Sequence, residues 1–367
     1  MVDDVSWRMI FYINLPVGVL AAWLASQQLQ ETEKTTALPF DYKGFLLAGI
    51  GFSTALVALT YAPQDGWGAA NIVALFAVSA LALSAWIVVE LREPSPLLDL
   101  RILGNPIFTL ATGISFVIII GFYAGLFLLA QFWQNVRQLS AIQTGLLFVP
   151  EMVPIAVLMP LCGRLYDRIG ARPLLIAGLI AMGYATLQLH VLDVSTGNAT
   201  LLHILILRGV GLGLIAMPVI TLALSLVPPA QVARASALIN VLRQVMLALG
   251  LAAVVTLLQT RQALHFSNLA QTATPDSLTV VQVLAGLEQE AAQHGVPPTM
   301  AQQIALQELT SFVQRQSAVM AFDDVFFVLG ILLLAALAPT LFLRQPARAF
   351  AAAPAPEDVS VHRDVTH

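Results

Sequence analysis

The chain has 367 residues, of which 58% are hydrophobic and only 10% are charged. Soluble domains carry about a quarter charged residues, so this composition excludes an ordinary water-soluble globule. The formal net charge is −4 without any basic block, which argues against nucleic acid as a partner. The single cysteine, Cys162, excludes an intrachain disulfide and any metal site built from several cysteines.

Nine apolar segments are long enough to cross a bilayer as helices, which takes about 20 mostly apolar residues each. We therefore expect an all-α polytopic membrane protein. The predicted spans are Met9–Ser26, Gly44–Ala62, Ala70–Val89, Ile107–Trp133, Thr144–Cys162, Pro173–Leu189, Leu201–Val227, Ala235–Gln259 and Val325–Leu343.

Between two of these spans lies a short polar link, Gly163–Arg172, that contains three arginines. Short loops rich in Lys and Arg stay on the cytoplasmic side, and alternation from this link places most other basic residues on that side too. This predicts a multi-pass protein of the cell's inner (plasma) membrane with a cytoplasmic C terminus. Gly163 and Gly170 are expected to form the turns at the two helix ends.

Several motifs along the chain resemble a known family. Ser6–Gly18 has the sequence Ser-Trp-Arg-Met-Ile-Phe-Tyr-Ile-Asn-Leu-Pro-Val-Gly, and Gly163–Arg172 has Gly-Arg-Leu-Tyr-Asp-Arg-Ile-Gly-Ala-Arg. Arg208–Gly213 and Asn240–Gln244 follow in the same order and spacing. Together they resemble the fourteen-helix drug:proton antiporter branch of the major facilitator superfamily, although Ala171 replaces one of its paired basic residues.

The resemblance implies a domain organisation. Residues 1–30 would be the last helix of an N-terminal bundle, and residues 31–105 two extra central helices with a linker. Residues 106–343 would form a C-terminal six-helix bundle with an outer loop at 260–320, followed by a disordered cytoplasmic tail at 344–367. On this resemblance we expect the chain to be an incomplete transporter that starts at about the sixth helix.

Three charged residues, Glu151, Arg208 and Arg243, lie inside predicted spans, where a charge is costly and indicates function. Glu151 lies near the middle of its span, and Arg208 lies at a comparable depth in another. We expect the two side chains to face one central cavity and interact. Glu151 then either carries a proton or cation for coupling or serves as one half of a structural ion pair.

A second polar group lies on the helix that contains Asn240, Arg243 and Gln244. Their i, i+3, i+4 spacing places them on one helix face. They form either a polar wall or gate of the pathway, or hydrogen bonds between helices that fix packing. Gln131 and Gln134 are expected to face the same cavity. Close helix packing explains the glycines of Arg208–Gly213 better than a nucleotide site does, because they follow no strand.

The polar link also contains a candidate conformational latch. The resemblance implies that Asp167 and Arg168, with Gly163, Gly170 and Arg172, hold cytoplasmic helix ends together in one state of the transport cycle. The alternative is that the arginines of the link only set topology.

By resemblance, the function is proton-coupled efflux of drugs or amphipathic organic compounds by alternating access. The partners would be a small-molecule substrate, protons and the lipid bilayer, with a missing N-terminal half or an accessory exporter subunit as further candidates. No metal-ligand spacing, Ser-His-Asp set or phosphate loop is visible, so we expect neither a cofactor nor an enzyme. The alternatives are export of a metabolite, lipid or siderophore, or a non-transporting subunit that binds a partner through the outer loop.

Overall fold

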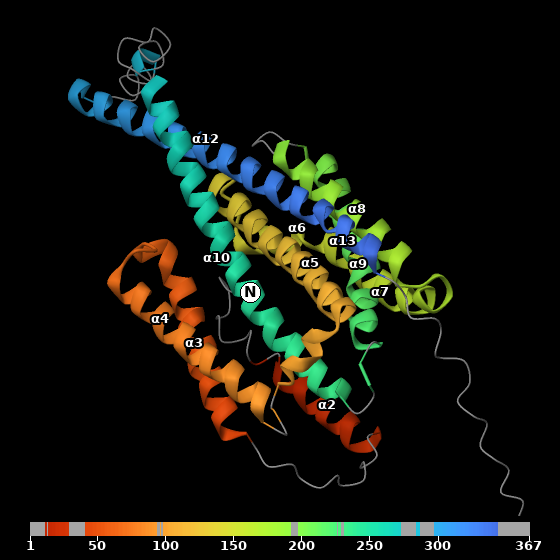
Figure 1. The fold of residues 1–367 in the computed structure, drawn as a ribbon. Helices are drawn as coiled ribbons and strands as arrows, with labels where there is room; N and C mark the ends of the chain where they lie inside the picture. The colour runs from red at the N-terminus through yellow and green to blue at the C-terminus, as the bar shows by residue number, and fades with distance from the viewer. Residues whose placement is uncertain are drawn as a thin grey trace, which may run out of the picture. The chain divides into compact units, whose positions relative to one another are not determined.

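The computed structural model describes residues 12, 14–28, 41–93, 96, 98–191, 197–225, 227–228, 231–272, 284–286 and 297–343. All regular structure in these residues is helical (Figure 1). The α-helices are α2 (Asn14–Gln28), α3 (Tyr42–Asp65), α4 (Ala70–Arg92), α5 (Pro106–Gln131), α6 (Ala141–Leu147), α7 (Val149–Ile169), α8 (Ala171–Gln188), α9 (Asn198–Ser225), α10 (Val232–Thr272), α12 (Pro298–Ala335) and α13 (Leu337–Phe342). Three short elements join them: the 3-10 helices η1 (Leu100–Gly104) and η3 (Leu189–Val191) and the π-helix η2 (Phe132–Val136).

Eight helices in the described part of the chain are long and apolar enough to cross a membrane, counting short consecutive helices as one. They include eight of the nine predicted spans. The ninth prediction, Met9–Ser26, overlaps α2, a helix of 15 residues. Large apolar side chains on these helices are exposed, such as Leu81 at 73%. Such a surface is stable in contact with lipid and unfavourable in contact with water. The protein is therefore an all-α, multi-pass membrane protein.

The chain divides into two compact units. The first contains Met1–Asp99, Leu126–Val149 and Gln262–Val319. Within it, α3 and α4 form an antiparallel hairpin (Figure 1). Close approach at Gly51 lets Ser79 Oγ donate a hydrogen bond to its carbonyl oxygen at 2.9 Å. In membrane helices such small and polar residues replace the hydrophobic effect as the source of helix association.

A buried glutamate fixes the end of this hairpin. Glu90 is 1% exposed, and its Oε1 accepts hydrogen bonds from Trp86 Nε1 at 3.1 Å and from the backbone N–H of Leu98 at 3.0 Å. A buried carboxylate needs such donors. Glu90 thus fastens the segment that follows α4 to the helix itself.

The second unit contains Leu100–Gly125, Pro150–Arg261 and Met320–His367. Its helices meet at small residues, as predicted for the glycines of α9. A Cβ at Gly211 would lie 2.6 Å from the backbone nitrogen of Met182 in α8, and a Cβ at Gly209 would collide with the carbonyl oxygen of Glu151 in α7. The packing interpretation of these glycines is confirmed.

The polar link differs from its prediction. Residues 163–169 are the last two turns of α7, and only Gly170, with φ +86°, leaves the helix before α8 begins at Ala171. The expected turn at Gly163 is wrong, because the charged residues after it continue the helix beyond the apolar segment. Gly170 does form the expected turn.

The predicted outer loop at 260–320 also differs. Residues 260–272 continue α10, and residues 298–320 are the first part of α12. Long helices rather than a loop therefore occupy both flanks of this stretch. The residues between them lie outside the described part, apart from 284–286, as does the predicted tail at 344–367.

Candidate functional site: a buried ion pair behind an apolar cavity

The second unit contains an ion pair at the depth of the membrane interior. Arg208 Nη1 lies 2.8 Å from Glu151 Oε1, and both side chains are 0% exposed. Each residue lies roughly ten residues, or about 15 Å, inside its candidate span. The predicted interaction of Glu151 with Arg208 is therefore present in the structure.

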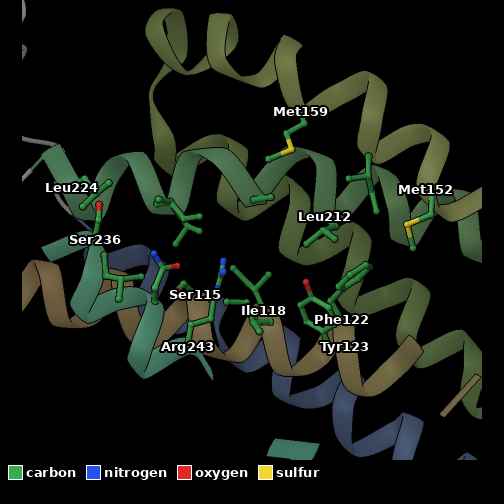
Figure 2. A pocket seen from close by; sticks show the side chains of 17 residues that line it. Ser115, Ile118, Phe122, Tyr123, Met152, Met159, Leu212, Leu224, Ser236 and Arg243 are labelled. Atoms are coloured by element: carbon green, nitrogen blue, oxygen red, sulfur yellow. The ribbon is translucent and has the colours of Figure 1, made fainter. Parts of the chain in front are cut away.

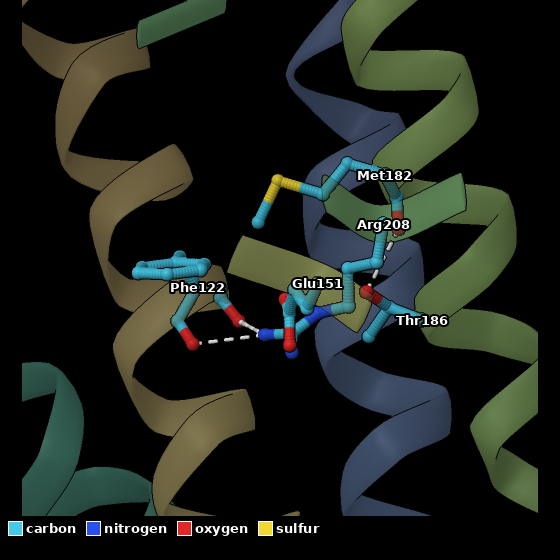
Figure 3. Close-up of polar contacts among 6 residues, drawn as sticks. Phe122, Glu151, Met182, Thr186 and Arg208 are labelled. Carbon is cyan, nitrogen blue, oxygen red and sulfur yellow. Dashed lines mark hydrogen bonds and ion pairs between the residues drawn. The ribbon is translucent and has the colours of Figure 1, made fainter. Parts of the chain in front are cut away.

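Arg208 is anchored from a third helix as well. Its Nη2 donates hydrogen bonds to the carbonyl oxygens of Gly121 at 3.0 Å and Phe122 at 2.8 Å, both in α5 (Figure 3). The guanidinium carbon also lies 5.6 Å from the centroid of the Phe122 ring, within the range of a cation–π interaction. One side chain of α9 thus joins α5 and α7.

The pair leaves polar atoms unsatisfied. Glu151 Oε2 and Arg208 Nε have no hydrogen-bond partner among the described residues. Neighbouring Thr186 uses its hydroxyl to donate to the carbonyl oxygen of Met182 at 2.8 Å in its own helix (Figure 3). A buried carboxylate with one oxygen unpaired can accept a proton there without losing its contact with arginine.

Two glycines create the space that this pair occupies. Gly209 lets α9 approach the backbone of α7 beside Glu151, and a Cβ at Gly125 would collide with Nη2 of Arg208. The guanidinium therefore fits only because α5 carries no side chain at position 125. The sequence around Gly125 does not indicate that this position must lack a side chain.

A cavity of about 400 Å³ lies next to the pair, within the second unit. This size lies within the range of small-molecule sites, about 300–1,000 Å³. Its walls come from α5, α7, α9 and α10 and are mostly apolar (Figure 2). The lining residues are Ser115, Ile118, Ile119, Phe122, Tyr123, Met152, Ile155, Met159, Leu212, Ala216, Val219, Ile220, Leu224, Ser236, Ile239, Asn240 and Arg243.

Arg243 is the one charged side chain among these lining residues. Figure 2 shows it between Ser236 and Leu224 on one side and Phe122 and Tyr123 on the other. Asn240 lines the cavity one turn before Arg243, whereas Gln244 is exposed and does not line it. Two of the three residues that were predicted to share a helix face thus line this cavity.

The expectation that Glu151 and Arg208 face this cavity is wrong. Neither lines it, because both are fully enclosed behind its wall. Their neighbours do line it: Met152 follows Glu151, and Phe122, which accepts a hydrogen bond from Arg208, contributes its side chain. The pair and the cavity are therefore linked through Met152 and Phe122.

The predicted glutamines, Gln131 and Gln134, belong to the first unit. Gln131 accepts a hydrogen bond from Asn135 at the start of η2, and Gln134, within η2, is exposed. Neither residue is among those that line the cavity of the second unit, so the expectation that they face it stays a prediction.

The predicted latch residues lie together at the junction of α7 and α8. Asp167 and Arg168 are exposed in the last turn of α7, and Arg172 is exposed in the first turn of α8. Gly170 separates the two helices, and Gly163 lies inside α7. Whether these residues act as a latch stays a prediction.

Among the described residues, no group of three or more His, Cys, Asp or Glu side chains could hold a metal ion. The residues that line the cavity offer one guanidinium, hydroxyl groups, one amide and apolar surface, including Met152 and Phe122. Such a set can bind and orient an organic molecule.

Comparisons with known proteins agree with this architecture. The family model described as the Major Facilitator Superfamily matches residues 1–251. The chain is 28% identical over 351 residues to the uncharacterized MFS-type transporter YhcA of Bacillus subtilis (strain 168), covering 94% of this chain and 65% of that protein. It is also similar to the multidrug transporter protein MdtP of the same organism, at 31% identity over 61% of this chain and 41% of MdtP.

A third relative is the fatty acid resistance protein FarB of Neisseria gonorrhoeae, 29% identical over 93% of this chain and 66% of FarB. The chain thus spans between 41% and 66% of the length of these three relatives. With a matching family model over more than half of its residues and an all-helical, multi-pass architecture, the chain belongs to the Major Facilitator Superfamily.

Proposed function

We propose that this protein exports small amphipathic organic molecules by alternating access, with the cavity of the second unit as part of the substrate pathway. The cavity is the observation that carries the proposal, because it is mostly apolar, about 400 Å³ and lined by four membrane helices. Family membership and the name of MdtP, a multidrug transporter protein, support transport rather than enzymatic chemistry.

We further propose that export is coupled to protons at Glu151. An ionisable residue deep in a membrane protein commonly belongs to a proton relay. Glu151 has one oxygen paired with Arg208 and one without a partner among the described residues, so it has a position where a proton can bind.

Sidedness and the latch complete the proposal. The arginine-bearing junction of α7 and α8 would face the cytoplasm of a cell whose plasma (inner) membrane contains the protein. Asp167 and Arg168 would hold helix ends together there when the pathway is closed to the inside.

The test is efflux from cells that express the complete gene in a host lacking its own exporters. Cells loaded with a panel of fluorescent amphipathic dyes should lose dye faster than vector controls, and a protonophore should abolish the difference. The proposal fails if the protein reaches the membrane and no compound in a chemically broad panel leaves faster. Efflux that persists under the protonophore would reject proton coupling alone.

A further inference from the structure

We infer that the cavity selects amphipathic monoanions, such as a carboxylate attached to an apolar body, over cations of the same size and shape. This inference rests on the proposed function and names its substrate class. It follows from the positive charge of Arg243 on the cavity wall and from the lack of an acidic side chain among the lining residues.

Arg243 carries the positive charge of the cavity wall. It lines the cavity, is half-buried, and makes no hydrogen bond or ion pair with any residue that the structure describes. A charge away from bulk water needs a counterion or hydrogen-bond acceptors. A guanidinium offers a planar pair of donors that matches a carboxylate. An anionic ligand would therefore supply a negatively charged partner for Arg243, which the described residues do not provide.

The carboxylate of Glu151 does not reach the cavity wall. Glu151 immediately precedes Met152, which lines the cavity. The carboxylate of Glu151 is nevertheless enclosed and paired with Arg208. None of the lining residues is acidic. A cationic ligand would thus meet Arg243 with no opposite charge on the wall.

The aromatic ring of Phe122 does not reverse this preference. A cation could stack on Phe122, but the guanidinium of Arg208 already lies 5.6 Å from the centroid of that ring. A second cation at the same ring would be repelled by the first. Phe122 instead provides apolar area beside Ile118 and Leu212 for the body of the ligand.

The experiment compares two probes that differ only in head-group charge. Both carry the same pyrene body and linker; one ends in a carboxylate and the other in a trimethylammonium group. Binding to the purified full-length protein in a non-ionic detergent is followed by fluorescence anisotropy. We expect the anion to bind at least about tenfold more tightly, the size of effect that one charge-assisted hydrogen bond gives.

Variants then locate the preference. Arg243→Gln should remove it, Arg243→Lys should retain most of it, and Arg243→Glu should invert it in favour of the cation. Arg261→Gln is the matched control, because it makes the same change in the same helix at an exposed residue that pairs with Asp324 at 3.7 Å. It should bind both probes as the unaltered protein does.

The unaltered protein alone can overturn the inference. Equal binding of both probes, tighter binding of the cation, or binding of neither would each do so, even if Arg243 variants fail to fold. Because efflux is measured separately, a protein that exports dyes but prefers the cation would retain its proposed function and lose this substrate class. A preference for the anion that survives in Arg243→Glu would also contradict the inference.

Discussion

Arg208 Nη2 lies 2.8 Å from the carbonyl oxygen of Phe122, while the ring of Phe122 forms part of the cavity wall. The same residue therefore contacts both a buried charge and the space where a ligand would lie. A ligand that shifts α5 at this point would alter the hydrogen bonds of Arg208, and through Arg208 the pairing of Glu151. This provides a short physical route between substrate binding and a titratable carboxylate.

Gly125→Ala should disrupt this arrangement from the α5 side. The added methyl group would collide with Nη2 of Arg208, so the guanidinium must move away from its carbonyl acceptors. We expect a lower unfolding temperature of the purified protein and reduced efflux from cells. Gly113→Ala is the control in the same helix, because nothing lies within 4 Å of a Cβ there. Equal behaviour of the two variants would contradict the proposed packing.

Glu151→Gln should leave Arg208 as an uncompensated buried charge. Loss of one partner of a buried pair costs about 3–5 kcal/mol, so we expect a less stable protein and at least a tenfold loss of proton-driven efflux. Glu308→Gln makes the same chemical change at an exposed position of α12 and should have no effect.

The double variant Glu151→Gln with Arg208→Gln separates coupling from structure. Removing both charges should recover much of the stability lost in the single variant, because no unpaired charge remains. If Glu151 couples protons, efflux stays lost in the double variant. Restored proton-driven efflux would instead assign the pair a purely structural role.

The junction between α7 and α8 gives two glycine substitutions with opposite expected signs. Gly170 has φ +86° and ψ 177°, a region almost confined to glycine, so Gly170→Ala strains the backbone at a cost of about 1–3 kcal/mol. Gly163 lies inside α7 with nothing within 4 Å of a Cβ, so Gly163→Ala should stabilise the helix by up to about 1 kcal/mol. Thermal unfolding of both purified variants measures the difference. Destabilisation by both would indicate that position 163 is not an ordinary helical site.

The latch hypothesis predicts a defect in cycling without a defect in insertion. Asp167→Asn should reduce the rate of efflux several-fold, because the altered side chain loses its charge at the α7–α8 junction, while the amount of protein in the membrane stays normal. Asp65→Asn, at the end of α3, is the control. Normal efflux by Asp167→Asn would leave the arginines of the junction with topology as their only role.

Sidedness can be measured with single cysteines in a Cys162→Ser background, since Cys162 is buried. Position 172, at the start of α8, and position 267, in the polar part of α10, are both exposed. Membrane-impermeant maleimide applied to intact cells should label a cysteine at 267 and spare one at 172. Labelling of both from the same side would overturn the predicted topology.

Much of the fold could be predicted from the sequence, because apolar length decides which segments cross a membrane. The pairing of Glu151 with Arg208 was also predictable, since two opposite charges at similar depth have few other ways to be compensated. The face of α10 was predicted only in part. Asn240 and Arg243 line the cavity while Gln244 does not, and which edge of a polar stripe faces inward depends on the neighbouring helices.

Other features gave no local signal. The backbone carbonyl of Phe122 accepts a hydrogen bond from a residue 86 positions away, and every residue has a carbonyl group. Gly163 resembles a turn residue in sequence because it follows an apolar run, yet α7 continues through it. In both cases the deciding contacts or conformations come from tertiary structure.

The length of α10 has a practical consequence. Its 41 residues make a continuous helix of about 60 Å, roughly twice the thickness of the hydrocarbon layer. A rod that extends so far past a detergent micelle would remain visible in electron micrographs as a protrusion outside the micelle. Particles of this membrane protein could be aligned on that protrusion without an added antibody fragment.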